Sequence, residues 1–391
     1  MTPRLYLDNA ATSFPKPPEV FEAMRAYWET LGASAGRGAY REAVETGEIV
    51  AGCRRRLARL IRAASPETVV FTFNGSGALS QAIKGLLRDG DHVVTSTLEH
   101  NSVLRPISAL GTQRGVLVTH VPADPSTGRV RAADMEAAIR PETRLIALVH
   151  ASNVIGTIQP VAEVGASARK RGIPFLVDAA QTAGHLPIDV EALCADLLAM
   201  PGHKGLMGPL GTGALYIKPG MESRLRPLLE GGTGSASERP VQPEFMPDKF
   251  ESGSHNAIGL AGLSAAIGWV ETRTIEALAG HERTICNRFL DGAAQVHGLT
   301  VYGPPVAEGR VAVFSVRLAG LEPSELSAAM ETEFGILTRS GIHCAPLAHE
   351  ALGTHRDGGT TRVSFGAFST QDDVDRCLAC LAELSSVAAN A

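Results

Sequence analysis

The sequence predicts an α/β fold with a mostly parallel sheet, and three observations lead to this. Apolar runs of strand length alternate with helical stretches between residues 69 and 200. Polar or glycine-rich segments follow the carboxyl ends of these runs, which is where sites gather in open α/β sheets. The chain has 391 residues, 44% of them hydrophobic, which is enough for a large core and two domains.

The elements can be taken in order along the chain. Residues 1–16 look irregular, a helix is expected at 18–28, and a glycine-rich loop covers 32–38. The next helix has apolar residues spaced three and four apart, namely Ile49, Cys53, Leu57, Leu60 and Ile61. Strands are then expected at residues 69–73, 92–96, 116–121, 145–149, 174–177 and 197–200. Their alternation with helices favours helices on both faces of the sheet.

The last third of the chain has a different pattern. Helical stretches beyond about residue 260 lead into shorter strands at 310–318 and 361–365. A last helix begins near Thr370, whose hydroxyl can cap it, and its apolar face includes Val374 and Leu381. This pattern predicts a smaller α+β domain.

Composition excludes several kinds of partner. The 36 basic and 41 acidic residues give a net charge of −5 with no basic run, so no nucleic-acid surface is expected. The sequence has no apolar run long enough for a membrane span and no signal-peptide pattern, so we expect a cytoplasmic protein without a membrane partner. Six cysteines spread through such a chain favour free thiols over a disulfide framework.

The segment from Met200 to Gly213 holds the first candidate for catalysis. Lys204 follows His203 there, between glycines. A lysine whose pKa is lowered by its surroundings can form a Schiff base with an aldehyde such as that of pyridoxal phosphate. A solvated lysine on a surface loop would show the same local pattern, so residues elsewhere in the chain must decide.

Asp178 is such a residue, because it follows the buried run 174–177. A pyridoxal cofactor needs an acid at its pyridine nitrogen, since a protonated ring is the better electron sink. Asp178 is expected at the carboxyl end of a strand, where sites form, and it is the candidate for that acid. A carboxylate that caps a helix is the alternative explanation.

Together with the motif from Leu7 to Thr12, these segments resemble the cysteine desulfurase family, which are pyridoxal phosphate (PLP) enzymes of the class V aminotransferase type. The resemblance extends to the final helix. It implies the PLP-dependent transferase fold (fold type I), with a large PLP-binding domain at residues 17–260. Residues 1–16 and 261–391 would form a small discontinuous domain that carries the cysteine loop. The resemblance also implies a homodimer.

A glycine-rich turn before a predicted helix is the candidate phosphate site. Free amides at a helix N-terminus suit an anion, which makes Gly75, Ser76 and Gly77 candidate cofactor contacts. The turn nearly matches the dinucleotide fingerprint, but Ser80 stands at the third glycine position and such a site needs no Schiff-base lysine. We therefore favour pyridoxal phosphate over a nicotinamide cofactor.

The resemblance implies further cofactor contacts. His100 would stack on the pyridine ring and assist proton transfers, Gln181 would face its phenolic oxygen, and His203 would also contact the cofactor. Asn153 would lie near the cofactor and the substrate carboxylate. Thr233, in a glycine-rich loop, would contact the phosphate bound by the partner subunit. Local sequence alone has simpler explanations for three of these positions. His100 could be structural, Asn153 could be an ordinary turn residue, and Thr233 could lie in a flexible loop.

Cys344 is the candidate nucleophile among the six cysteines. It lies in a polar loop near Arg339 and His343, and a cationic neighbourhood raises the fraction of a thiol present as thiolate. A zinc site is the alternative, since His349 and His355 are also close in sequence. This set contains one thiol, and its members are irregularly spaced, unlike the ligands of a structural zinc site. No metal is therefore expected.

Arg362 lies in a predicted strand, where a guanidinium is costly unless it meets an anion. Its planar fork matches a carboxylate, so Arg362 is the expected clamp on an amino-acid substrate. The resemblance adds Arg339, Asn153 and Ala11 as substrate contacts.

The resulting hypothesis is a PLP-dependent cysteine desulfurase. Lys204 would hold the cofactor and then remove the Cα proton of L-cysteine, and the Cys344 thiolate would attack the substrate sulfur. The products would be L-alanine and a Cys344 persulfide. The alternatives are a selenocysteine lyase acting on L-selenocysteine, another PLP aminotransferase or C–S lyase, and a non-catalytic sulfur-transfer scaffold. A sulfur-acceptor protein is expected, for example in iron–sulfur cluster biogenesis, but the sequence does not identify it.

Two residues depart from the family pattern. Pro201 stands where many relatives have a hydroxyl residue, and Gly77 stands where many have a glutamate. Neither change touches Lys204, Asp178 or Cys344. We therefore expect altered phosphate contacts and retained chemistry.

Overall fold

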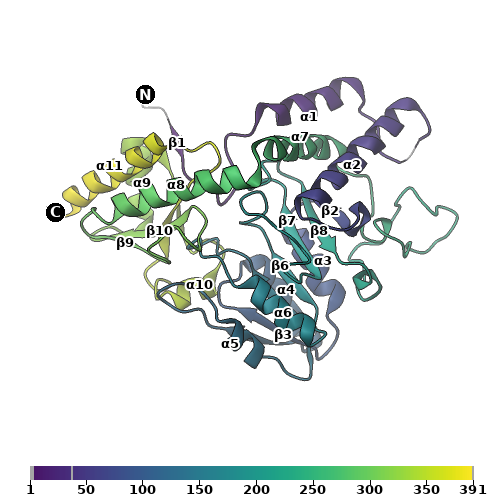
Figure 1. Cartoon of the computed structure of the whole chain (residues 1–391), viewed down its shortest axis with the longest axis horizontal. Coiled ribbons are helices and arrows are strands. Elements are labelled where there is room, and N and C mark those ends of the chain that lie inside the picture. The colour runs from purple at the N-terminus through teal and green to yellow at the C-terminus, as the bar shows by residue number, and fades with distance from the viewer. Residues whose placement is uncertain (1–3, 37, 390–391) are drawn as a thin grey trace.

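The computed structural model describes residues 4–36 and 38–389 (Figure 1). Its large sheet has seven strands in the order β2-β8-β7-β6-β5-β3-β4. They are β2 (Val69–Thr72), β3 (His92–Ser96), β4 (Leu117–Val121), β5 (Thr143–Val149), β6 (Phe175–Asp178), β7 (Leu197–Pro201) and β8 (Gly213–Ile217). The neighbours from β4 to β7 pair in parallel, whereas β8 runs antiparallel to both β7 and β2. The predicted α/β class with a mostly parallel sheet is confirmed.

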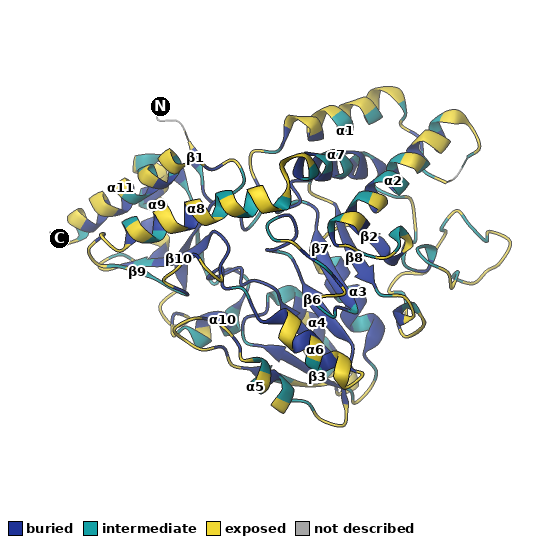
Figure 2. Ribbon diagram, in the orientation of Figure 1, coloured by how far each residue is buried: buried dark blue, intermediate teal, exposed yellow. Residues whose placement is uncertain are grey.

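Helices cover both faces of this sheet, and its strands are buried (Figure 2). Successive residues of a strand point to opposite faces, so Leu176 packs into one core while Phe175 and Val177 pack into the other. The first core includes side chains of α3 (Gly75–Leu86) and α4 (Asn101–Arg114). The second includes side chains of α2 (Arg41–Leu60), α6 (Val161–Lys170) and α7 (Ala257–Arg273). Burial on both faces explains why the strands read as continuous apolar runs.

A second sheet lies toward the end of the molecule that holds both termini (Figure 1). Its antiparallel strands, in the order β12-β13-β10-β9, are β9 (Leu299–Val301), β10 (Val313–Leu318), β12 (Arg339–Gly341) and β13 (Thr360–Ser364). Three helices share one apolar core with this sheet, namely α8 (Ile275–Ala293), α9 (Pro323–Phe334) and α11 (Gln371–Ala388). Thr370 caps α11, as expected, by accepting a hydrogen bond from the amide of Asp373.

The N-terminal segment joins this second core. Strand β1 (Leu5–Tyr6) pairs in parallel with β11 (Ile336–Leu337), and Asp8 forms a bridge with Ser364. The remaining α-helices are α1 (Pro18–Thr30), α5 (Ala132–Ala137) and α10 (Pro346–Ala351). Helix α1 packs on α7. Residues from the two ends of the chain are therefore neighbours in space.

Some elements differ from the sequence prediction. Residues 1–16 are not wholly irregular, because β1 forms there, but two residues are too few to show a periodic pattern. Strand β8 was not predicted, since it follows the glycine-rich segment closely. Residues 1–3, 37 and 390–391 lie outside the described residues. No helix within 4–36 and 38–389 combines the length and apolar character that a membrane span needs.

Candidate active site

The carboxyl ends of the parallel strands β5, β6 and β7 open into one cavity of about 230 Å³. Segments distant in the sequence meet there, because the cavity also contacts the N-terminal segment, the first turn of α3 and strand β12. Ten of the predicted site residues line it, namely Ala11, Gly75, Ser76, His100, Asn153, Asp178, Gln181, His203, Lys204 and Arg339. The structure thus brings most of the predicted site together.

Lys204 and Asp178 both line this cavity, and burial shifts the pKa of each. Burial lowers the pKa of Lys204 to about 8, against the opposing effect of the Asp178 charge. Burial raises the pKa of Asp178, and a hydrogen bond from the amide of Ala180 to Oδ1, at 2.9 Å, acts in the other direction. No described residue donates to the second carboxylate oxygen, which can therefore accept from a ligand. The cavity offers a reactive amine and a buried acid.

Glycines fix the backbone around Lys204. A Cβ on Gly202 would lie 2.1 Å from the hydroxyl of Thr212, and a Cβ on Gly205 would lie 2.5 Å from the carbonyl oxygen of Ala183. Only glycine fits where the backbone makes such close approaches. The two glycines therefore let the loop pack tightly on both sides of Lys204.

The first turn of α3 is joined to His100 by hydroxyl groups. The Ser76 and Ser102 hydroxyl oxygens lie 2.7 Å apart, and the Ser102 hydroxyl lies 2.9 Å from Nδ1 of His100. Burial, followed by the charge of Lys204, lowers the pKa of His100 to about 4, so its imidazole is neutral at neutral pH. The amides of Gly75 and Ser76 have no acceptor within the described part of the chain. They remain available to an anion.

Gln181 and His203 tie the cavity wall to the N-terminal segment. Gln181 donates from Nε2 to the carbonyl oxygen of Ala10 at 3.0 Å. The carbonyl oxygen of His203 accepts from Lys16 Nζ at 2.7 Å, while Nδ1 of the His203 ring is buried without a partner among residues 4–36 and 38–389. Burial lowers the pKa of His203 to about 4. Its neutral ring can receive a ligand.

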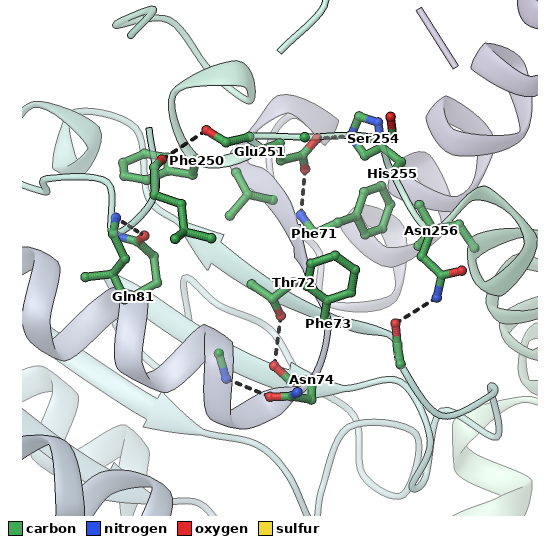
Figure 3. A pocket seen from close by; sticks show the side chains of 18 of the residues that line it. Phe71, Thr72, Phe73, Asn74, Gln81, Phe250, Glu251, Ser254, His255 and Asn256 are labelled. Carbon is green, nitrogen blue, oxygen red and sulfur yellow. Dashed lines mark hydrogen bonds and ion pairs between the residues drawn. The ribbon is translucent and has the colours of Figure 1, made fainter. Parts of the chain in front are cut away.

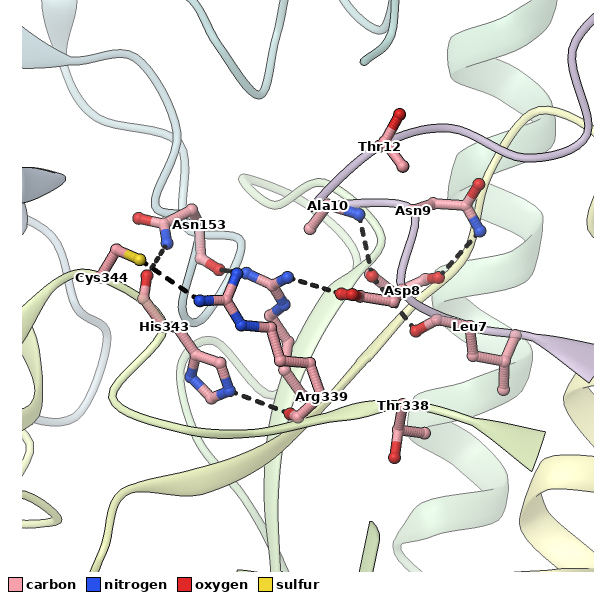
Figure 4. Close-up of polar contacts among 12 residues, drawn as sticks. Leu7, Asp8, Asn9, Ala10, Thr12, Asn153, Thr338, Arg339, His343 and Cys344 are labelled. Atoms are coloured by element: carbon pink, nitrogen blue, oxygen red, sulfur yellow. Dashed lines mark hydrogen bonds and ion pairs between the residues drawn. The ribbon is translucent and has the colours of Figure 1, made fainter. Parts of the chain in front are cut away.

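The loop after β12 presents Cys344 next to this cavity (Figure 4). Arg339 donates from Nη2 to the Cys344 sulfur at 3.2 Å, and Arg339 and His343 line the cavity. The amide of Asn101 donates to the carbonyl oxygen of Cys344, and Asn153 donates from Nδ2 to that of His343, both at 2.7 Å. The predicted nucleophile is therefore in contact with a side chain that lines the cavity of Lys204.

Arg362 lies behind this loop with 1% of its surface exposed. It donates to Oδ1 of Asp8 at 2.6 Å and to the carbonyl oxygen of Asn153 at 3.0 Å. Burial lowers the pKa of Arg362, against the charge of Asp8. The guanidinium expected to clamp a substrate carboxylate is thus already paired with a carboxylate of the protein.

Comparisons with known proteins agree with this geometry. The family model described as aminotransferase class V matches residues 5–377. A probable cysteine desulfurase of Methanothermobacter thermautotrophicus is 36% identical over 373 residues, which cover 95% of this chain and 92% of that protein. The chain belongs to the cysteine desulfurase family of class V aminotransferases.

Solved structures from the cysteine desulfurase family share the whole architecture. The apo structure of a cysteine desulfurase from Thermococcus onnurineus NA1 matches with a TM-score of 0.92 and 33% identity, over 98% of this chain and 95% of that one. The cysteine desulfurase CsdA of Escherichia coli matches with a TM-score of 0.86 and 28% identity, over the same shares of the two chains. The predicted fold type I and family are confirmed.

Cysteine desulfurases are PLP-dependent, and the cavity fits that cofactor in three respects. Lys204 offers an amine whose pKa is lowered to about 8. Asp178 offers a buried carboxylate that lines the cavity and whose second oxygen accepts from no donor among the described residues. The first turn of α3 offers the unpaired amides of Gly75 and Ser76 for a phosphate. An amine, an acid and an anion site are the groups that PLP needs.

Two of the predicted cofactor contacts, Gly77 and Thr233, do not line this cavity. The Gly77 amide donates to Oδ1 of Asn74 at 2.8 Å and so caps α3 instead of remaining free. Thr233 bonds through its hydroxyl to Ser235. The expected contact of Thr233 is to another subunit, so its role stays a prediction.

Two further residues were not selected from the sequence. Ser102 joins Ser76 to His100, and its position in the first turn of α4 was an available signal for a hydrogen-bonding role. Asp8 pairs with Arg362, which lies 354 residues away in the chain. Asp8 belongs to the motif that carried the family resemblance, but sequence spacing gave no sign of its partner.

A second cavity, of about 360 Å³, lies beside α3 and is mainly apolar (Figure 3). Glu251 lies at its wall, where it pairs with Arg54 and His255 at 2.6 Å and accepts from the amide of Phe71 at 2.6 Å. The two cavities share Asn74, the N-cap of α3. The groups suited to PLP chemistry are in the Lys204 cavity.

Proposed function

We propose that this protein is a PLP-dependent cysteine desulfurase that converts L-cysteine to L-alanine and receives the sulfur on Cys344 as a persulfide. The observation that carries this proposal is that Arg339 lines the Lys204 cavity and also donates to the Cys344 sulfur. A thiol beside a cationic group is the nucleophile that sulfur transfer needs. Membership of the cysteine desulfurase family supports the same reaction.

We propose that Lys204 holds the cofactor as a Schiff base, that Asp178 bonds to its pyridine nitrogen and that His100 lies on its ring. The other proposed contacts are Gln181, His203, Asn153, Gly75 and Ser76, with Thr233 from the partner subunit. Bound in this way, PLP withdraws electrons from the substrate and so acidifies its Cα–H bond. The buried carboxylate and the unpaired amides of the cavity support these assignments.

The residues of the chain would move the protons and the sulfur. Lys204 takes the Cα proton, and its pKa of about 8 leaves part of the amine neutral for this task near neutral pH. The neutral His100 ring assists these transfers. The Cys344 thiolate attacks the substrate sulfur, so that an S–S bond forms while the Cβ–S bond breaks. The electron pair of the Cβ–S bond stays on Cβ, which takes up a proton to become the methyl group of alanine, and Lys204 would return its proton to Cα.

The substrate carboxylate would bind near the arginine residues of the C-terminal third. We propose contacts with Arg339, Asn153 and Ala11, which line the cavity. Arg362 lies next to them, although Asp8 shares its guanidinium. Arg362 would therefore act as a clamp whose position Asp8 sets.

We also propose a division into domains, a subunit arrangement and a location. Residues 17–260 would form the large PLP-binding domain, and residues 1–16 and 261–391 the small one, because Leu5 and Leu7 share an apolar core with α8, α9 and α11. The functional unit would be a cytoplasmic homodimer. An unidentified acceptor protein would collect the sulfur.

The decisive experiment is mass spectrometry of Cys344 after incubation of the PLP-loaded protein with L-cysteine. One added sulfur atom on Cys344, with equimolar L-alanine, is the expected result, and Cys344→Ala should form neither. Alanine production that survives Cys344→Ala would instead indicate simple elimination. Running L-selenocysteine in parallel separates a desulfurase from a selenocysteine lyase.

A further inference from the structure

Two buried histidines lie behind the Cys344 loop and form a chain of hydrogen bonds. Nδ1 of His343 lies 3.2 Å from Nε2 of His349. At one end, Nε2 of His343 lies 3.0 Å from the carbonyl oxygen of Arg339, and at the other, Nδ1 of His349 lies 2.8 Å from the Thr354 hydroxyl. Arg339 and Thr354 flank the loop that holds Cys344. The chain of hydrogen bonds therefore closes this loop across its base.

The ends of this chain determine where its hydrogens are. A carbonyl oxygen only accepts, so Nε2 of His343 carries the hydrogen and Nδ1 of His343 accepts. His349 must then donate from Nε2, which leaves its Nδ1 to accept from the hydroxyl of Thr354. Burial lowers the pKa of His343 to about 2 and that of His349 to about 4. Both rings are therefore neutral at neutral pH, as this arrangement requires.

The backbone of the loop needs such support. His343 and Cys344 are consecutive residues with φ of 51° and 58°, in the left-handed region that residues with a Cβ rarely adopt. Such a conformation is strained and persists only where neighbouring groups hold it. The carbonyl oxygens of both residues accept hydrogen bonds, from Asn153 and from the amide of Asn101. The conformation that presents Cys344 persists because the surrounding groups hold it.

We propose that His349 is a positioning residue for sulfur transfer, because its hydrogen bond to His343 closes the chain that holds the Arg339 backbone at the base of the Cys344 loop. This inference rests on the proposed function, in which Cys344 receives the sulfur. His349 has 0% of its surface exposed and is not among the residues that line the cavity. It therefore acts on the reaction only through His343 and the loop.

The test compares two substitutions of His349 with a matched control. His349→Gln keeps an N–H donor near the position of Nε2, whereas His349→Leu keeps volume and removes the donor. His92→Leu is the control, since His92 is also fully buried and bonded on both sides, to Thr143 and Thr119, at the opposite end of the sheet. The measurements, on the PLP-loaded protein, are single-turnover persulfide formation on Cys344, the KM for L-cysteine, and hydrogen–deuterium exchange of the amides in residues 339–354.

We expect His349→Leu to form the persulfide about 10- to 100-fold more slowly, because a small displacement of a reacting group costs about this much. KM should stay unchanged, and exchange in the loop should become faster. His349→Gln should recover both the rate and the protection, and His92→Leu should retain them per folded molecule. Wild-type rate and exchange in His349→Leu, or a Gln variant as slow as the Leu variant, overturn the proposal.

A failure of the proposed function gives a different result. In that case the wild-type protein forms no persulfide on Cys344, and hydrogen–deuterium exchange alone decides the role of His349. Faster exchange in His349→Leu that His349→Gln reverses supports the positioning role. Unchanged exchange in the loop contradicts it.

Discussion

The guanidinium of Arg339 lies 3.2 Å from the sulfur of Cys344, measured from Nη2 to Sγ. Arg339 belongs to β12 and Cys344 to the loop that follows, so their contact depends on the conformation of a short segment. Arg339 also lines the cavity of Lys204. One side chain thus connects the proposed sulfur acceptor to the proposed cofactor site.

Removing this guanidinium should slow sulfur transfer. Arg339→Ala removes a charged donor from the sulfur, and a hydrogen bond to a charged group contributes about 1.5–3 kcal/mol, so we expect persulfide formation about 10- to 100-fold slower. Quenched-flow mass spectrometry of Cys344 measures this rate. The spectrum of bound PLP should not change. Arg339→Lys keeps the charge but not the planar guanidinium, so its rate should lie between those of the wild type and Arg339→Ala. A wild-type rate in Arg339→Ala would contradict a role of Arg339 in sulfur transfer.

Cofactor attachment should depend on pH through Lys204. Its pKa is lowered to about 8, and only the neutral amine attacks an aldehyde, so the rate of PLP binding to the apoprotein should rise with pH and level off above about pH 8. The visible absorbance of the protein-bound cofactor reports this rate. Lys204→Ala should show no such band. If the rate of PLP binding keeps rising with pH up to the usual pKa of lysine, the pKa of Lys204 is not lowered.

Replacing Asp178 should separate cofactor binding from catalysis. Asp178→Asn keeps the size of the side chain and removes the acid, so the pyridine ring would no longer be held protonated. We expect kcat to fall about 100-fold, which is the scale of losing one group that stabilises charge in a transition state. PLP content, measured after release from the protein, should stay near one per chain. Near-normal turnover in Asp178→Asn would exclude this carboxylate as the ring partner.

The ion pair between Asp8 and Arg362 should matter for stability. Asp8→Ala leaves a buried guanidinium without its carboxylate, which costs roughly 3–5 kcal/mol. Urea unfolding of the apoprotein measures this loss. Asp8→Ala combined with Arg362→Met removes both charges and should recover much of the stability. If the double variant is no more stable than Asp8→Ala, the pair is not the source of the effect.

Pro201 should limit the affinity for PLP. It lines the cavity at the end of β7, and a Cβ on Gly75 would lie 3.3 Å from its ring, so it lies next to the proposed phosphate site. Pro201→Ser supplies a hydroxyl donor there, and one hydrogen bond contributes about 1 kcal/mol, or about five-fold in affinity. Equilibrium titration of the apoprotein with PLP measures the change. Pro201→Ala controls for loss of the ring, and equal affinities in the two variants would exclude a phosphate contact at this position.

Much of the site could be predicted because it follows the strands. Strands buried on both faces read as apolar runs, and parallel strands bring their carboxyl ends to one edge. Asp178 and Lys204 both follow such runs, and they line the same cavity. Cys344 required the family resemblance as well, since a polar loop with a cysteine occurs for many reasons.

Other features depend on pairs of residues that periodicity does not relate. The chain from Arg339 through His343 and His349 exists only in the folded loop, where the left-handed backbone brings the two rings together. In the sequence these histidines suggested a zinc site as an alternative. The described residues contain no group of three side chains that could hold a metal, and these two histidines bond to each other. Gly77 was expected to bind phosphate, but local helix capping uses its amide.

The pairing of β1 with β11 affects when this protein becomes competent during synthesis. Leu5 and Tyr6 leave the ribosome early, yet their sheet partners, Ile336 and Leu337, are made near the end. Domains fold as their segments emerge, so the seven-stranded sheet, complete at Ile217, can form long before that pairing. Asp8 is likewise made early, whereas its ion-pair partner Arg362 is made near the end of synthesis. The second core, and the strand β12 that leads to Cys344, can therefore be completed only when the chain is nearly finished.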